Sequence, residues 1–200
     1  MLAAQIIVAL QTIVSRENSP LDPAVVTVGS IHGGTRYNII PDEVNLQLTV
    51  RAFKEAVRQK LIASIERIAK GTAIAAGVPA ERLPIVKVSE TEVTTATYND
   101  PTLTERLAKV LALALGQQNV VKINPVMGSE DFGYLSLNQQ IPSAYFFIGA
   151  SEPAKIKQSS ETGVPLPSLH SSLFAPVPEP TIRTGVKTLT VATLDLLKKR

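Results

Sequence analysis

An alternating run of apolar and polar residues most restricts how this chain can fold. From Val44 to Arg51, aliphatic side chains alternate with polar ones, which is the period of a strand with one buried and one solvated face. The run AVVTV at 24–28 predicts a second, buried strand. A loop containing glycine and proline separates the two runs. The sequence therefore predicts two consecutive strands joined by a loop.

Helices are predicted on both sides of these strands. Residues 2–16 read as a helix that ends before Pro20, and residues 54–76 carry aliphatic side chains at helical spacing. Residues 85–88 predict a third strand. The resulting order, α-β-β-α-β, lacks only the first strand of the β-α-β-β-α-β ferredoxin-like unit. We therefore expect that strand to precede residue 1.

Composition and charge narrow the cellular setting. The apolar stretch at residues 1–14 has no basic segment or small-residue cleavage site and is too short to span a bilayer, so we expect a buried amphipathic helix. The absence of cysteine excludes disulfides and fits a cytoplasmic protein. Because the basic residues are scattered and strand 44–51 has no aromatic residue for base stacking, we expect neither a membrane nor a nucleic-acid partner.

The second half of the chain has a different organisation. Its order of elements is typical of the edge of an α/β domain whose earlier strands are absent. We place the boundary so that residues 1–96 form one domain and residues 97–200 another. The predicted elements of the second half are a helix over 102–115, strands over 119–123 and 144–148, a loop over 150–180 and a helix over 181–198.

Few side chains in this sequence can carry chemistry. The two histidines, His32 and His170, each lie in a predicted loop, where a lone histidine is more typically an exposed side chain than a ligand. Glu130 follows a Gly-Ser turn after a strand, and α/β proteins place their sites in such loops. The alternative is that Ser129 or Asp131 caps a short helix.

Arg51 ends the alternating strand on its polar face. A guanidinium group at this position could bind a carboxylate through two hydrogen bonds, and it could equally be a solvated strand residue. The Gly33-Gly34 pair could cradle an anion, but the pair is more typical of a hairpin turn. The pattern alone leaves both questions open.

Two segments together resemble a family of metal-dependent amidohydrolases that includes aminoacylases, hippurate hydrolases and auxin-conjugate hydrolases. The first runs from Val28 to Thr35, continues through Asn-Ile-Ile-Pro-Asp at 38–42 and ends at Arg51. It resembles the family's lid, or dimerisation, domain. The second comprises residues 127–132 and the Leu-His-Ser-Ser-Leu-Phe run at 169–174, and it resembles the C-terminal catalytic segment.

The resemblance implies a fold and a set of site residues. The fold would be of the α/β class, with an α+β lid: an incomplete ferredoxin-like lid or dimerisation domain followed by the C-terminal part of an α/β dinuclear-metal hydrolase domain. His170 would be a metal ligand, Glu130 would support catalysis, and Asn38, Arg51 and His32 would contact substrate. The cofactors would be divalent ions (Zn, Mn, Co or Ni), with most ligands outside this chain.

The resemblance also implies a function and a partner. The family's metal motifs, a Cys–His motif, a Glu-Glu pair and another histidine, are absent from this sequence. We therefore expect an inactive piece of an enzyme that hydrolyses the amide bond of small N-acyl amino acids. We also expect a homodimer formed through the lid domain. The alternative is a non-catalytic dimerisation or binding module.

Overall fold

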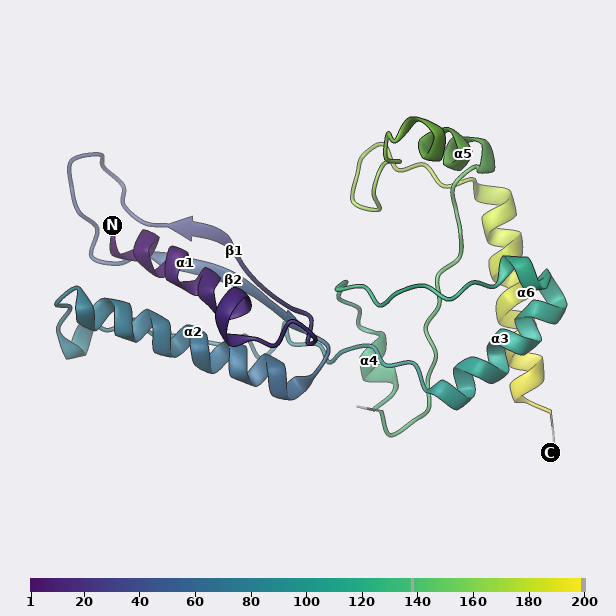
Figure 1. The fold of residues 1–200 in the computed structure, drawn as a ribbon, viewed down its shortest axis with the longest axis horizontal. Coiled ribbons are helices and arrows are strands. Elements are labelled where there is room, and N and C mark those ends of the chain that lie inside the picture. Colours follow the sequence, from purple (N-terminus) through teal and green to yellow (C-terminus); the bar gives the residue numbers. More distant parts are fainter. Residues whose placement is uncertain (138, 199–200) are drawn as a thin grey trace. The chain divides into compact units, whose positions relative to one another are not determined.

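A computed structural model describes residues 1–137 and 139–198, which form two compact units (Figure 1). Unit 1 comprises residues 1–97 together with 125–137, and unit 2 comprises residues 98–124 together with 139–198. The segment 125–137 thus packs with the first half of the chain. The division into domains 1–96 and 97–200 stays a prediction.

Unit 1 is a β-hairpin with two helices on one face. The two strands are antiparallel and form the only sheet in the part of the chain that the structure describes. The two long helices run alongside the hairpin (Figure 1). In chain order, the elements are α1 (Leu2–Thr12), the π-helical turn η1 (Ile13–Glu17), β1 (Ala24–His32), β2 (Asn45–Ala52), α2 (Glu55–Ala75), the 3-10 turn η2 (Ala80–Arg82) and α4 (Phe132–Leu135).

The core of unit 1 lies between the helices and the apolar face of the hairpin. Because side chains alternate across a strand, every second residue of β2 faces the helices and the others face away. Leu10 and Ile13 from the first helical segment and Leu61 from α2 are each 1% exposed. Around them pack the strand residues Ala24, Val26, Val28, Leu46, Leu48, Val50 and Ala52.

Shortening a core side chain in α1 should strongly destabilise unit 1. We expect Leu10→Ala to lower the free energy of unfolding by about 2–5 kcal/mol, because it removes buried methyl groups and leaves a cavity. Val8 is the matched control, since it lies on the same helix and is 71% exposed; Val8→Ala should change the stability by about 0.5 kcal/mol or less. Urea unfolding of both variants measures the difference, and equal stabilities would contradict this account of the core.

An ionic cluster ties the end of the first helical segment to α2. The Glu17 carboxylate accepts hydrogen bonds from Ser64 Oγ at 2.8 Å and from Arg67 Nη2 at 2.5 Å. Hydrogen bonding to Arg67, followed by that to Ser64, lowers the pKa of Glu17 below its ordinary value of 4.5. These contacts hold the π-helical turn against the middle of α2.

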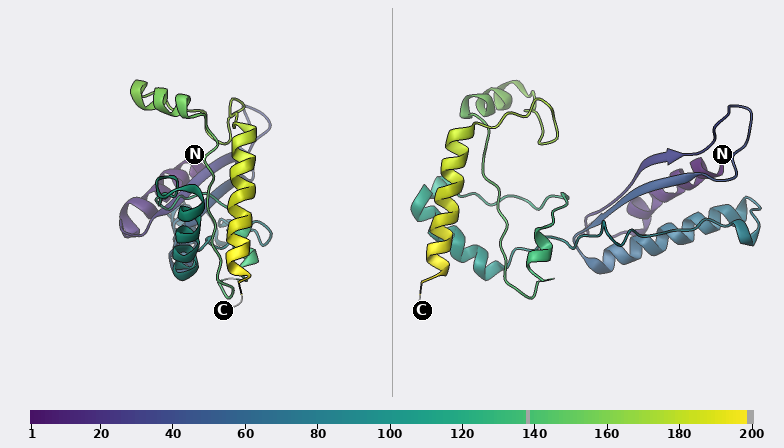
Figure 2. Two further views of the ribbon diagram at one scale, coloured as in Figure 1. Left: turned by 90° about the vertical axis from the view of Figure 1, so that its right-hand side faces the viewer. Right: turned by 180° about the vertical axis from the view of Figure 1, so that it is seen from behind.

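Unit 2 is built on two packed helices, α3 and α6, which run side by side in the left view of Figure 2. Leu107 and Leu111 of α3 and Ala192 of α6 are buried. Beside them, Arg106 Nε donates to Asp195 Oδ2 at 2.7 Å, and this bond lowers the pKa of Asp195 below its ordinary value of 3.8. The elements of unit 2 are α3 (Pro101–Leu115), the 3-10 turn η3 (Gln117–Asn119), α5 (Pro153–Thr162) and α6 (Pro178–Leu196).

Three predicted strands are wrong: residues 85–88, 119–123 and 144–148 form no strand. A strand requires a neighbour to satisfy its backbone groups, and no strand outside the β1–β2 pair is present in the described residues. At Tyr145, the Asn99 side chain replaces that neighbour. It donates from Nδ2 to the Tyr145 carbonyl at 2.8 Å and accepts from the Tyr145 amide at 2.7 Å.

The predicted helices are confirmed, with small shifts of their ends. The predicted loop at 150–180 is wrong in part, because α5 lies within it. This helix begins with Pro153 in its first turn and ends at Gly163, whose φ of 72° is left-handed. Its exposed, polar surface has no apolar stripe, which is why hydrophobic periodicity did not reveal it.

Candidate functional site

A β-bulge at Gly29 decides which residues of β1 face away from the core. Before it, Val28 pairs with Leu48; after it, Ser30 pairs with Gln47 and His32 with Asn45. The extra residue shifts the alternation by one position, so Ser30 and His32 join the polar side chains of β2 on the outer face. Ser30 Oγ donates to Gln47 Oε1 at 2.6 Å. Apart from Val25, which pairs with Arg51, the paired residues on the outer face of the hairpin are polar.

Arg51 lies on this outer face and contacts the predicted catalytic segment. Its Nη1 donates to the carbonyl oxygen of Met127 at 2.5 Å. Two further bonds attach the same segment to unit 1: the hydroxyls of Thr94 and Ser129 lie 3.0 Å apart, and the Tyr134 hydroxyl donates to the Val93 carbonyl. The structure thus brings Arg51 into contact with the segment that contains Glu130. The two contacting residues, Arg51 and Met127, are 76 positions apart in sequence.

Glu130 itself is exposed and precedes a short helix, α4. Asp131 occupies the N-cap position of that helix, but its side chain makes no capping hydrogen bond. Ser129 bonds to Thr94. Neither Ser129 nor Asp131 therefore caps the helix through its side chain, and Glu130 is an exposed residue three positions after Met127.

His32 and Arg51 lie on the same face of the hairpin but at its opposite ends. His32 pairs with Asn45, and Arg51 is six positions further along β2, which corresponds to about 20 Å at the rise of an antiparallel strand. Asn38 lies beyond His32, in the exposed loop that connects the strands (Figure 1). The structure therefore does not bring His32 or Asn38 together with Arg51 within one chain.

His170 lies in unit 2, on an exposed turn. The Ser171 amide donates to the Ser168 carbonyl at 2.9 Å, and the Phe174 amide donates to the Ser171 carbonyl at 3.0 Å. The Ser171 hydroxyl accepts from the Leu173 amide at 3.1 Å, so it is engaged within the turn. Nowhere in the described residues do three histidine, aspartate or glutamate side chains gather as they would around a metal ion.

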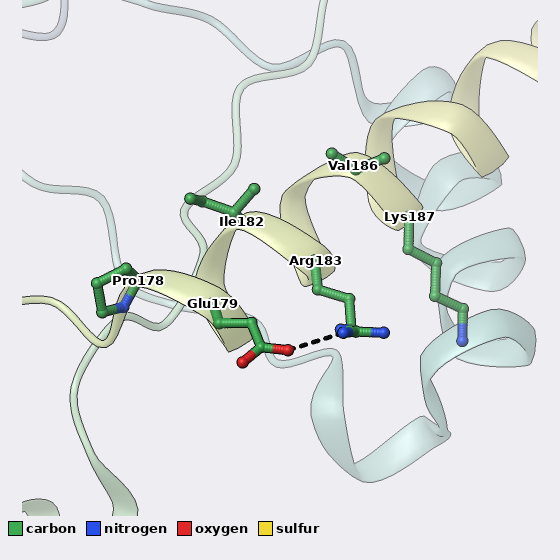
Figure 3. A pocket seen from close by; sticks show the side chains of 6 residues that line it. All are labelled: Pro178, Glu179, Ile182, Arg183, Val186 and Lys187. Carbon is green, nitrogen blue, oxygen red and sulfur yellow. Dashed lines mark hydrogen bonds and ion pairs between the residues drawn. The ribbon is translucent and has the colours of Figure 1, made fainter.

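An open groove along the first turns of α6 contains none of these residues (Figure 3). Its apolar floor is formed by Ile182 and Val186, which are 65% and 62% exposed. Glu179 and Arg183 form an ion pair of 2.8 Å along its edge. All of the lining residues come from the one helix, so the groove is a solvent-facing helix surface.

None of the helices in the described part is both long and apolar enough to cross a membrane.

Comparison with known proteins identifies the class of unit 1. Residues 1–76 match the family model of the peptidase dimerisation domain, which comprises α1, the hairpin and α2. Residues 1–76 therefore belong to the dimerisation-domain family of M20 peptidases, and the resemblance to metal-dependent amidohydrolases predicted from the two motifs is confirmed.

Individual relatives agree with this assignment. The chain is 34% identical to thermostable carboxypeptidase 1 of Saccharolobus solfataricus, over 77% of this chain and 37% of that protein. It is also 34% identical to the IAA-amino acid hydrolase ILR1-like 4 of Arabidopsis thaliana, over 86% of this chain and 36% of that protein. The chain therefore spans little more than a third of the length of these relatives.

A solved structure extends the likeness to the fold. The YXEP protein of Bacillus subtilis, described as a dinuclear metal binding peptidase from the M20 family, superposes with a TM-score of 0.62 at 25% identity, over 98% of this chain and 45% of that one. The predicted fold class, a dimerisation domain followed by part of an α/β hydrolase domain, is confirmed.

Proposed function

We propose that this chain is part of an enzyme that hydrolyses the amide bond of N-acyl amino acids or related amides with the help of divalent metal ions. The observation that carries the proposal is the contact of Arg51 with the backbone of the Gly-Ser-Glu segment at Met127. This contact holds Arg51, the proposed carboxylate-binding residue, against the segment that contains Glu130, the proposed acidic residue. The names of two relatives, a carboxypeptidase and an IAA-amino acid hydrolase, support a substrate that contains an amino acid.

Arg51 is the proposed anchor for the substrate's carboxylate. A guanidinium group has five N–H donors in a planar fork, and the bond to Met127 uses one of them. The remaining donors can bind a carboxylate through two parallel hydrogen bonds. Because Met127 fixes the guanidinium, less side-chain freedom is lost when a ligand binds.

The substrate-binding residues act across two copies of the chain. Arg51 lies about 20 Å from the end of the hairpin that carries the Asn38 loop, whereas an N-acyl amino acid, with the length of two residues, spans about 7 Å. One substrate cannot therefore reach both residues of one chain. The dimerisation-domain match supports a homodimer in which Arg51 of one copy and Asn38 of the other share a site, with His32 near the entering loop.

The metal centre receives His170 from this chain, and its other ligands are proposed to come from residues that the chain does not contain. His170 alone does not fit a catalytic ion, which takes three or more protein ligands. The likeness to a dinuclear metal binding peptidase supports divalent ions, with Zn, Mn, Co and Ni all suited to imidazole and carboxylate ligands. Such ions polarise a carbonyl group and lower the pKa of bound water. Glu130 is the acid–base candidate of this chain.

The 200-residue chain alone should hydrolyse amides at a negligible rate. Its turnover of N-acetyl and N-benzoyl amino acids in the presence of added Mn or Zn is the measurement, with a version extended by the remaining ligands as the active control. We expect this because the chain carries one predicted metal ligand, His170, whereas a catalytic ion takes three or more protein ligands. Turnover by the 200-residue chain at the rate of the extended version would contradict the proposed division of the metal site.

A second candidate is a non-catalytic dimerisation module. It is favoured by the match of residues 1–76 alone to a dimerisation domain. The extended version decides between the two, because a binding module would remain inactive with the metal ligands supplied.

A cytoplasmic location is proposed from the absence of cysteine.

A further inference from the structure

The loop between β1 and β2, residues 33–44, is anchored at its base. Gly33 lies so close to Val44 that a Cβ atom would come within 2.8 Å of Val44 Cγ2, and Gly34 has a left-handed φ of 81°. Near the other end of the loop, Arg82 Nη2 donates to Asp42 Oδ1 at 3.2 Å. Both ends of the loop thus contact neighbouring residues, while its middle projects beyond the hairpin (Figure 1).

The tip of this loop is a tight turn with apolar side chains in full contact with water. The Ile39 amide donates to the Arg36 carbonyl at 3.4 Å, which makes Tyr37 and Asn38 the two corner residues. Tyr37 is fully exposed and Ile40 is 94% exposed. An anchored loop that presents an aromatic ring and an aliphatic side chain around one amide group has the composition of a binding surface.

We propose that Tyr37 contacts the acyl group of the substrate that Asn38 binds, so that the site selects N-acyl amino acids with a large apolar, especially aromatic, acyl group. The proposal rests on the proposed function. Consecutive Cα atoms are 3.8 Å apart, and both side chains leave the same turn. A ligand whose amide carbonyl is bound by Asn38 therefore has its acyl group within reach of the Tyr37 ring.

The two corner residues recognise different parts of the substrate. The Asn38 amide can donate to a carbonyl oxygen, which every N-acyl amino acid has, and so cannot distinguish acyl groups. The phenol ring of Tyr37 offers an apolar face on which another ring can stack. Selection among acyl groups therefore falls to Tyr37, with Ile40 adding apolar surface on the other side of Asn38.

The test compares the affinities of N-benzoylglycine and N-acetylglycine for the whole chain by NMR titration. The wild-type chain should prefer the benzoyl ligand, and Tyr37→Ser should reduce that preference by about 2- to 10-fold, the usual worth of an aromatic pair. The affinity for N-acetylglycine should fall less, because its methyl group offers the ring little surface. Tyr37→Phe should keep the preference, and Arg51→Ala should weaken both ligands equally.

The other outcomes are distinguishable. A benzoyl preference that survives in Tyr37→Ser contradicts the role of Tyr37 and leaves the proposed function standing. Binding of neither ligand to the wild-type chain contradicts the proposed function, and the inference with it. If Tyr37→Ser instead dissociates the dimer in sedimentation experiments and leaves the preference intact, Tyr37 anchors the subunit interface and the inference is overturned.

Discussion

Replacing His170 with alanine is expected to remove one metal equivalent and nearly all amide hydrolysis from a version of the protein that carries the remaining metal ligands. Loss of residues that only orient metal ligands typically costs 10- to 100-fold in metal affinity or activity, so loss of a ligand should lower kcat by about 100-fold or more. Metal analysis after dialysis and steady-state kinetics on an N-acyl amino acid measure the two effects.

Leu169→Ala provides the matched control for His170→Ala. Leu169 is the neighbouring residue of the same exposed turn and is itself 68% exposed, so its loss should leave folding and metal content unchanged. A His170→Ala variant with full metal content and activity would refute the ligand assignment. Equal losses in both variants would show that the turn, and not the imidazole, is what matters.

The helices of this protein could be predicted from its sequence because their signals are local. Leu61, Ile65 and Ala69 of α2 recur at helical spacing and face one core, and Pro101 marks the first turn of α3. The helix α5 was missed because its surface is polar, although Pro153 and Gly163 mark its two ends. In an exposed helix, the terminal residues therefore carry more information than periodicity.

The strands could be predicted only where both partners lie close together in sequence. The run at 44–51 pairs with 24–32 through one loop, whereas residues 144–148 have strand-like composition and no neighbouring strand in the described residues. Their backbone is partly satisfied by the Asn99 side chain. Composition shows that a segment could join a sheet, but pairing is a non-local property.

The site was predictable as residue types but not as an arrangement. The alternating pattern placed Arg51 on a polar face, and the structure agrees. The contact of Arg51 with Met127 joins segments far apart in sequence, and no local sequence pattern predicts it. Gly29 falls in the predicted loop that follows residue 28. A glycine inside a strand pattern often marks a bulge, and a strand continued through such a bulge puts His32 on the face that carries Arg51.

Mixing two inactive variants is expected to restore activity if two copies of the chain share each site. In the version with all metal ligands, Arg51→Ala removes the proposed carboxylate anchor and Asn38→Ala removes a donor to the reacting carbonyl. Each should lower kcat/KM by about 100-fold. In a heterodimer of the two variants, one site carries both substitutions and the other site carries neither.

Random exchange of subunits places half of the chains in such heterodimers, each with one intact site of two. The mixture should therefore regain roughly a quarter of the wild-type activity. Each variant mixed with itself is the control and should regain nothing. If Arg51 and Asn38 served the same site of one chain, every site in the heterodimer would lack one of them, and mixing would restore no activity. The distance of about 20 Å along β2 favours recovery, because no small N-acyl amino acid can bridge it within one copy.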